Sequence, residues 1–349
     1  MKSKTDMKRY GLSGSFFAEA DDGNDLTVSR VISQEKGMYR LVSAQGEKNG
    51  EVSGKFHYDV HTRSDYPAVG DFVMADWNEH GGNAVIHHIL PRKSCFIRKA
   101  AGDTKQEQVV AANIDIVFLC MSLNNDFNLR RLERYLSIAW ESGSTPVIIL
   151  TKSDLCKDPE SRLLEVSVAA AGVDILMTSS LEESSCEQLY PYLTEGKTAA
   201  FIGSSGVGKS TLINCLLGEN RLHTNGLRND DKGRHTTTHR ELILLPEGGM
   251  VIDTPGMREL GMWDAGEGID RTFADIEELA QECRFRDCTH SGEPGCAVQK
   301  ALESGELSID RLHSYQKLKK ENRYMEDREG YMDEKKRKFK NIAKINRKK

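Results

Sequence analysis

The chain has 349 residues, of which 38% are hydrophobic and 29% charged, and its formal net charge is −5. This length is enough to bury a full core and predicts two or three domains. No apolar run reaches the roughly eighteen residues of a membrane-spanning helix, and the N-terminus lacks the apolar segment of a secretory signal. We therefore expect a cytoplasmic protein with no membrane partner.

Charge is distributed unevenly along the chain. Residues 335–349 contain nine Lys or Arg and no acidic residue, and subtracting these nine charges from −5 leaves −14 on the other 334 residues. A basic tail on an acidic body is typical of a protein that contacts a polyanion, although a solvated disordered end has the same composition. We define residues 331–349 as the basic tail.

The first quarter of the chain predicts a small β-barrel. Residues 1–25 are polar, and we expect a flexible N-terminus there. Residues 26–95 contain short alternating strands separated by glycine and proline, which suits a barrel of the oligonucleotide-binding (OB) type, and an SH3-like barrel would give the same pattern. The expected strands are Thr27–Ser33, Gly37–Ser43, Glu51–Tyr58, Asp71–Asp76 and Asn83–Ile89.

A basic linker is expected at Pro91–Lys99, and the pattern then changes to alternating strands and helices. The expected strands in this region are continuous apolar runs, which are typical of buried parallel strands. Residues 105–262 therefore predict a doubly wound α/β domain. The expected strands are 114–121, 146–150, 173–177, 198–202, 241–245 and 250–252, and the expected helices are 129–142, 161–171 and 211–217.

A phosphate-binding loop is predicted where one of these strands meets a helix. The motif G-x-x-x-x-G-K-S begins at Gly203, in the strand–loop–helix context that it requires. Backbone N–H groups of such a loop surround phosphate oxygens, Lys209 would reach the β- and γ-phosphates, and the Ser210 hydroxyl would hold Mg²⁺. The residues predicted to bind the nucleotide here are Gly203, Ser204, Ser205, Gly206, Val207, Gly208, Lys209, Ser210 and Thr211.

Two further strand ends indicate that the base is guanine. Thr151-Lys152-Ser153-Asp154 is similar to the [N/T]-K-x-D element of GTPases, in which the carboxylate accepts hydrogen bonds from N1–H and the 2-amino group of guanine. Adenine lacks this pair of donors. Ser179 and Ser180, also at a strand end, suit the loop whose backbone contacts the guanine O6. An ATPase is the reading that these residues argue against.

The segment Asp253-Thr254-Pro255-Gly256 completes the predicted pocket. Asp253 would hold the Mg²⁺ shell, and the Gly256 N–H would approach the γ-phosphate. The guanine element precedes the phosphate loop in this chain, whereas ordinary GTPases have the opposite order. Because all these elements lie at one edge of the sheet, the same pocket can form from a circularly permuted chain.

The cysteines fall into two groups. Cys95, Cys120, Cys156, Cys186 and Cys215 are scattered, and we expect them to be reduced thiols. Cys283, Cys288, His290 and Cys296 lie within fourteen residues, which predicts one structural zinc ion in a closed Cys₃His site, with unligated thiols as the alternative. The surrounding residues 263–330 predict a helical zinc-binding domain, with helices at 308–316 and 317–325.

This motif order and these motifs resemble the RsgA family of ribosome small subunit-dependent GTPases. The resemblance extends from the barrel to about residue 325 and includes Phe127–Leu136 and Gly233–Thr238. It implies GTP hydrolysis that the 30S subunit stimulates, a role late in 30S maturation, and the 30S subunit with its 16S rRNA as partner. It also implies a C-terminal zinc module and a switch histidine at His235.

His235 is the candidate for orienting the attacking water. Ras-like enzymes use a Gln after D-x-x-G, but Met257 occupies that position here, and its thioether is too weak a hydrogen-bonding group to orient water. An imidazole can orient or deprotonate water, although a loop histidine without that role is the alternative. Thr237 is the favoured Mg²⁺ ligand in this segment, and Thr236 and Thr238 stay open. We therefore expect a monomeric enzyme that uses GTP, Mg²⁺ and zinc; a GTP-dependent RNA-binding switch with negligible turnover is the alternative.

Overall fold

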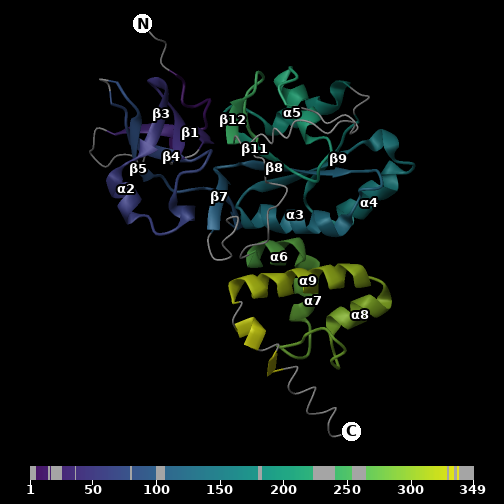
Figure 1. Cartoon of the computed structure of the whole chain (residues 1–349). Coiled ribbons are helices and arrows are strands. Elements are labelled where there is room, and N and C mark those ends of the chain that lie inside the picture. The colour runs from purple at the N-terminus through teal and green to yellow at the C-terminus, as the bar shows by residue number, and fades with distance from the viewer. Residues whose placement is uncertain are drawn as a thin grey trace, which may run out of the picture. The chain divides into compact units, whose positions relative to one another are not determined.

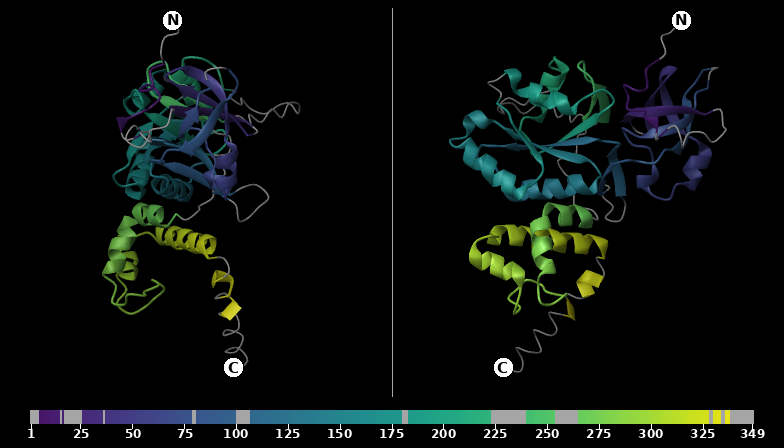
Figure 2. Two further views of the ribbon diagram at one scale, coloured as in Figure 1. Left: turned by 90° about the vertical axis from the view of Figure 1, so that its left-hand side faces the viewer. Right: turned by 180° about the vertical axis from the view of Figure 1, so that it is seen from behind.

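The computed structural model describes residues 5–14, 16, 26–35, 37–78, 81–99, 107–179, 183–222, 240–253, 265–327, 330–333 and 336–337. The chain forms two compact units (Figures 1 and 2). The first comprises Met1–Tyr135 and Ser142–Gly261, and the second comprises Leu136–Glu141 and Met262–Lys349. Among the helices so described, none is both long and apolar enough to cross a membrane.

The first unit begins with a closed five-stranded barrel, as predicted. Its strands are β1 (Thr27–Glu35), β2 (Met38–Ser43), β3 (Gly46–Val52), β4 (Phe72–Asp76) and β5 (Ala84–Ile89). They pair in the order β1-β2-β3-β5-β4, and β4 pairs again with β1 to close the ring. Val31, Leu41, Val73 and Ile86 fill the interior. Of the two barrel types that the sequence allowed, OB and SH3-like, a closed ring with a helix between β3 and β4 favours the OB type.

That helix corrects one predicted strand. The segment Glu51–Tyr58 was predicted to be one strand. Instead, β3 ends at Val52, and the following residues form α2 (Gly54–Asp59). The Ser53 side chain caps the helix by accepting a hydrogen bond from the Phe56 N–H, 3.0 Å away. The alternation of apolar residues suggested a strand, but the N-cap serine decides the local structure.

The nucleotide-binding part of the first unit is a doubly wound sheet. Its strands are β8 (Ile116–Ser122), β9 (Thr145–Thr151), β10 (Asp174–Met177), β11 (Thr198–Ile202), β12 (Arg240–Leu244) and β13 (Met250–Asp253). They are ordered β10-β9-β8-β11-β13-β12, and all neighbours are parallel except β12 and β13. As Figure 1 shows, α5 (Lys209–Leu217) covers one face, and α3 (Leu129–Glu141) with α4 (Pro159–Ala169) covers the other.

The barrel and this sheet are continuous rather than joined by a free linker. β1 pairs with β12 through Ser33 opposite Glu241 and Gln34 opposite Arg240. Gly70 also approaches the other part so closely that a Cβ there would lie 2.0 Å from the Ala112 carbonyl oxygen. The expected linker Pro91–Lys99 contributes β6 (Cys95–Lys99), which pairs with β7 (Glu107–Ala112).

Arg92 shows why composition alone misassigned that linker. Its guanidinium makes a two-pronged ion pair with the buried Asp71 carboxylate, with Nε and Nη2 each 2.8 Å from an oxygen. It also donates to the carbonyls of Ser64 and Tyr66, in and after the 3-10 helix η1 (Arg63–Asp65). A basic residue that looks like a solvated charge is therefore an internal connection.

A single buried arginine connects the barrel to the strands of the sheet. Arg30, on β1, is 1% exposed and donates to the carbonyls of Tyr10, Gly70 and Asn113 and to the Thr198 hydroxyl. Burial lowers the pKa of Arg30 to about 10, so the guanidinium stays charged at neutral pH. Its donors satisfy acceptors from four segments that are far apart in sequence.

Replacing this arginine should destabilise the first unit strongly. Arg30→Met keeps much of the side-chain volume but leaves several buried acceptors without donors, and we expect a loss of about 3–5 kcal/mol in the free energy of unfolding. The measurement is chemical denaturation. Arg40→Met, at an exposed barrel ion pair with Glu47, is the control and should change stability by less than about 1 kcal/mol. Equal effects of the two substitutions would contradict the assignment.

The N-terminal residues pack more closely than expected for a flexible segment. In the part of residues 1–25 that is described, Met7, Tyr10, Leu12 and Phe16 are buried. The Phe16 ring lies 4.3 Å from that of Phe72, measured between centroids. These apolar residues are scattered in a polar stretch and have no helical or strand periodicity, so the sequence did not predict their burial. Phe16, for example, is buried against Phe72 of the barrel.

The second unit is helical. It contains α6 (Gly266–Thr272), α7 (Ala274–Gln281), α8 (Ala297–Ser304) and α9 (Ile309–Glu326). The two helices predicted between residues 308 and 325 are one helix, because no Gly or Pro interrupts the segment and Ser308 caps it by accepting from the Arg311 N–H. Arg311 in turn holds α7 through two 2.7 Å contacts with the Asp275 carboxylate.

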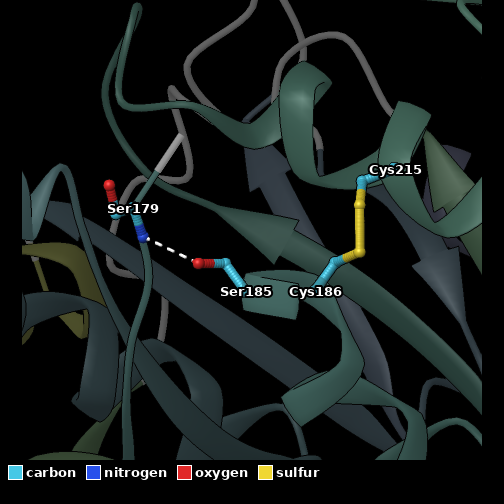
Figure 3. The surroundings of a disulfide bond; sticks show 4 residues. All are labelled: Ser179, Ser185, Cys186 and Cys215. Carbon is cyan, nitrogen blue, oxygen red and sulfur yellow. Dashed lines mark hydrogen bonds between the residues drawn. A yellow bond between two sulfur atoms is a disulfide. The ribbon is translucent and has the colours of Figure 1, made fainter. Parts of the chain in front are cut away.

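The prediction that all five scattered cysteines are reduced is wrong for two of them. Cys186 and Cys215 form a disulfide between residues 29 apart in sequence (Figure 3). Cys95, Cys120 and Cys156 are free thiols, and burial raises the pKa of the Cys120 thiol to about 12. Nothing in the spacing of isolated cysteines distinguishes a pair that the fold brings together.

Candidate nucleotide and metal sites

The predicted phosphate loop connects β11 to α5 directly. Ile202 ends the strand, residues 203–208 form the loop, and Lys209 begins the helix. Gly206 and Gly208 have φ of 75° and 110°, which other residues rarely adopt. A Cβ at Gly203 would lie 2.6 Å from the Cys120 carbonyl oxygen. The glycines are therefore required by backbone conformation and by close packing on β8.

The Lys209 ammonium lies within this loop. Its Nζ donates to the carbonyl oxygens of Gly203 and Ser204, at 2.7 and 2.6 Å. The Lys209 side chain thus folds back from the start of α5 over the loop that precedes this helix. A phosphate group bound in the loop would be within the reach of this cation, which is the arrangement expected for a charge that neutralises transferred phosphate.

The predicted guanine element lies against the phosphate loop, although the residues in contact are more than fifty positions apart in the sequence. Thr151, at the end of β9, donates from Oγ1 to the Val207 carbonyl at 2.6 Å. Lys152 adopts a left-handed conformation, with φ of 57°, and its Nζ donates to the Gly206 carbonyl at 2.7 Å. The side chains at 151 and 152 therefore join the predicted guanine element to the phosphate loop.

Asp154 is held at the base end by the loop that follows β10. The Ser179 hydroxyl donates to Asp154 Oδ1 at 2.7 Å, and Ser153 donates to the Thr178 carbonyl. The Ser179 N–H in turn donates to the Ser185 hydroxyl, in the 3-10 helix η3 (Glu183–Tyr192). The hydrogen bond from the Ser179 hydroxyl orients the carboxylate, and the second carboxylate oxygen can accept further donors.

One residue at this edge was missed by the sequence analysis. Asp126 follows β8, accepts a hydrogen bond from the Ser204 hydroxyl at 2.6 Å and pairs with Arg131 at 2.9 Å. The Ser204 hydrogen bond and the Arg131 charge lower the pKa of Asp126. The sequence pattern that identified Thr151–Asp154 could also have identified Asp126, because both are polar and follow a buried strand at the carboxyl edge of the sheet. We infer that Asp126 positions the phosphate loop.

The predicted Mg²⁺ residues are only partly described. Ser210 and Thr211 lie in the first turn of α5. Asp253 ends β13, and since Ala200 is opposite Ile252, it lies at the same sheet edge as the loop. Ser180, His235, Gly256 and Met257, together with Thr236, Thr237 and Thr238, fall outside the described residues.

The second unit brings the four predicted metal ligands together. One donor atom from each of Cys283, Cys288, His290 and Cys296 lies within 4.8 Å of the others. Cys296 Sγ is 3.5 Å from His290 Nδ1, and Cys283 Sγ is 3.8 Å from Cys296 Sγ. Zn–S bonds of about 2.3 Å in a tetrahedron separate ligand atoms by about 3.5–4 Å. The donor set and its spacing therefore fit a metal ion of zinc type.

Local structure explains how these ligands converge. Cys283 follows α7, and Cys296 caps the start of α8. His290 has a φ of 58°, in the left-handed region, and the Gln299 side chain donates to its carbonyl oxygen. A tight turn between two packed helices thus points the imidazole back toward the cysteines. The ligands are close in sequence, which is why spacing alone could identify them.

Comparisons with known proteins agree with this geometry. The sequence profile of the RsgA GTPase family matches residues 89–263. A protein of Lactiplantibacillus plantarum named small ribosomal subunit biogenesis GTPase RsgA 2 is 48% identical over 317 residues, covering 90% of this chain and 89% of that protein. An Oceanobacillus iheyensis protein named small ribosomal subunit biogenesis GTPase RsgA 1 is 43% identical, covering 92% of this chain and 93% of the relative.

Two solved structures are similar over most of the chain. YjeQ from Thermotoga maritima has a TM-score of 0.63 and 29% identity, covering 84% of this chain and 97% of its own. YloQ, described as a circularly permuted GTPase, has a TM-score of 0.63 and 27% identity, covering 88% and 98%. The permuted motif order, the pocket at the sheet edge and these relatives agree, and the chain belongs to the RsgA family of GTPases.

Proposed function

We propose that this GTPase binds the small ribosomal subunit, contacts its 16S rRNA, and hydrolyses GTP to GDP and phosphate late in maturation of that subunit. One observation carries the catalytic part: Thr151, Lys152 and the phosphate loop contact each other directly, so one pocket can hold both ends of a guanine nucleotide. The ribosomal part is supported by the names of relatives that match about nine-tenths of the chain.

The residues of the pocket have separable roles in this proposal. Asp154 selects guanine, and the residues of the loop from Gly203 to Gly208 surround the phosphates with N–H groups. Lys209 exchanges its two carbonyl partners for phosphate oxygens and stabilises the charge that develops during transfer. Mg²⁺, held by Ser210, Thr237 and Asp253, would neutralise charge between the β- and γ-phosphates when bound.

His235 supplies the role that Met257 cannot. We propose that its imidazole orients the attacking water, which is the contribution that a Gln makes in Ras-like enzymes. The alternative, a GTP-dependent RNA-binding switch with negligible turnover, is favoured by Met257 itself. In the first proposal the ribosomal subunit accelerates GTP hydrolysis. In the alternative GTP only controls whether the protein is bound to RNA.

The second unit offers the surface that would contact RNA. Arg284, Phe285 and Arg286 are exposed beside the Cys₃His cluster, and Phe285 is 41% exposed. Cations that neutralise phosphate next to a ring that can stack on a base are typical of RNA-binding modules. We propose that this surface and the basic tail bind rRNA, that one zinc ion holds the surface in shape, and that the monomer acts in the cytoplasm.

Single-turnover GTP hydrolysis tests the proposal. We expect purified 30S subunits to accelerate hydrolysis and 50S subunits to leave it unchanged. His235→Ala should lower the stimulated rate by roughly 10²–10⁴-fold, the usual contribution of a residue that orients or deprotonates water. GTP binding, measured by equilibrium titration, should not change. If 30S subunits fail to stimulate the wild-type protein, the switch without turnover becomes the better description.

A further inference from the structure

The Cys186–Cys215 disulfide joins the two elements that flank the nucleotide pocket. Cys215 lies on α5, the helix that begins at Lys209, and Cys186 lies on η3, which follows the guanine-side loop (Figure 3). Both elements pack on the same face of the sheet, where Leu189 and Leu216 belong to one buried cluster. The cross-link therefore lies behind the pocket, between its base side and its phosphate side.

On the base side, hydrogen bonds connect the disulfide to Asp154. Ser185, the neighbour of Cys186, accepts the Ser179 N–H at 3.0 Å, a contact drawn in Figure 3. The Ser179 hydroxyl donates to Asp154 Oδ1 at 2.7 Å. A displacement of η3 would therefore be transmitted to the carboxylate that selects guanine through only two intervening serines.

On the phosphate side, Cys215 is six residues after Lys209 on a short helix. Its neighbour Asn214 is 6% exposed and makes two 2.8 Å hydrogen bonds with the backbone of Leu222, donating to the carbonyl and accepting the N–H. Leu222 directly precedes the segment that contains His235. The helix end that carries Cys215 is thus joined to the phosphate loop in one direction and to Leu222 in the other.

The two bonded cysteines differ in exposure. Cys186 is 5% exposed, whereas Cys215 is exposed. Cys215 also lines a surface hollow of about 420 Å³, together with Thr211, Asn214, Gly218, Glu219 and Asn220. Thiol–disulfide exchange needs access to the sulfur that is attacked, so the exposed Cys215 is the residue at which exchange would begin.

We propose that Cys186–Cys215 is a thiol–disulfide exchange site for a dithiol, and that its oxidised form binds guanine nucleotides more tightly than its reduced form. One thiolate of the dithiol attacks Cys215 Sγ, forms a mixed disulfide and releases the Cys186 thiolate, which takes up a proton. The second thiol then attacks the mixed disulfide and releases Cys215. The dithiol ends as a disulfide, and its two electrons and two protons end on the two cysteines.

The physical reason for tighter binding is preorganisation. The cross-link restricts motion of η3 relative to α5, so Ser185, Ser179 and Asp154 stay in the positions that guanine needs. After reduction the pocket must be ordered again at each binding event. This inference rests on the proposed nucleotide pocket, but it adds a control of affinity that neither the pocket nor the family membership requires.

Titration of a fluorescent GDP analogue into the oxidised and dithiothreitol-reduced full-length protein, with zinc supplied, tests the proposal. We expect binding to weaken about three- to tenfold on reduction, because the cost of ordering the pocket should be similar in size to the net contribution of one hydrogen bond. The double variant Cys186→Ser, Cys215→Ser should bind like reduced wild type under both conditions. Cys95→Ser, which removes a free thiol away from the pocket, should respond like wild type.

A second measurement uses thermodynamic reciprocity. If the disulfide strengthens GDP binding, saturating GDP must shift the dithiothreitol-dependent ratio of disulfide to dithiol by the same factor. Equal GDP affinity in both redox states would overturn this inference and leave the pocket intact. Peptide mapping that finds Cys186 and Cys215 unlinked after oxidation would also overturn it. Failure to bind GDP in either state would overturn the pocket proposal, and this inference with it.

Discussion

Asp154→Asn should exchange guanine selectivity for xanthine selectivity. The carboxylate is expected to accept two hydrogen bonds from guanine, and each bond to a charged acceptor contributes about 1.5–3 kcal/mol. Loss of the charge and of one acceptor should weaken GDP binding by roughly 10²–10⁴-fold. Xanthine carries an oxygen where guanine has its 2-amino group, so the Asn amide can donate to it and recover binding.

The variant should also keep its fold, because the Asn carbonyl can still accept the Ser179 hydroxyl. Parallel titrations with GDP and XDP analogues give the preference directly. The matched control is Asp158→Asn, four residues away, where the side chain only caps α4 by accepting the Ser161 N–H. Asn is an equally good cap, so this control should prefer GDP as wild type does. An Asp154→Asn protein that still prefers GDP would exclude Asp154 as the base-selecting residue.

Removal of the metal should unfold the centre of the second unit. Structural zinc sites in zinc-finger peptides contribute roughly 10–16 kcal/mol at neutral pH, which is as large as the whole free energy of unfolding of a typical domain, about 5–15 kcal/mol. Cys296 is 3% exposed and lies between α8 and the other ligands. Cys296→Ser is therefore expected to abolish stoichiometric zinc binding and to reduce helicity.

Metal analysis of the purified protein and far-UV circular dichroism measure the two effects. Cys288→Ser should reproduce them, and Cys156→Ser, at a free thiol outside the cluster, should keep both zinc and helicity. Nucleotide affinity should change little in all three variants, because the pocket lies wholly in the first unit. Retention of one tightly bound zinc ion by both cluster variants would rule out this ligand set.

Local motifs were predicted well because neighbours along the chain remain neighbours in the fold. Each of two motifs lies within a short stretch of the chain: the strand, loop and helix around Gly203, and the Cys₃His cluster. Residue spacing alone was therefore enough to predict both. Errors of local structure had a local cause as well. The cap at Ser53 outweighed an alternating pattern and produced α2, and the absence of a helix breaker merged two expected helices into α9.

The sequence by itself determined the permuted order of motifs, and it predicted a guanine pocket at one sheet edge and a cluster of four metal-ligating side chains. Only the tertiary structure decided which distant residues meet. Arg30 reaches Thr198, Arg92 pairs with Asp71, and Cys186 bonds to Cys215. None of these residues differs in type or spacing from ordinary solvated or buried ones. Their roles arise because folding removes water and brings specific donors, acceptors and thiols into contact, and no local pattern encodes that proximity.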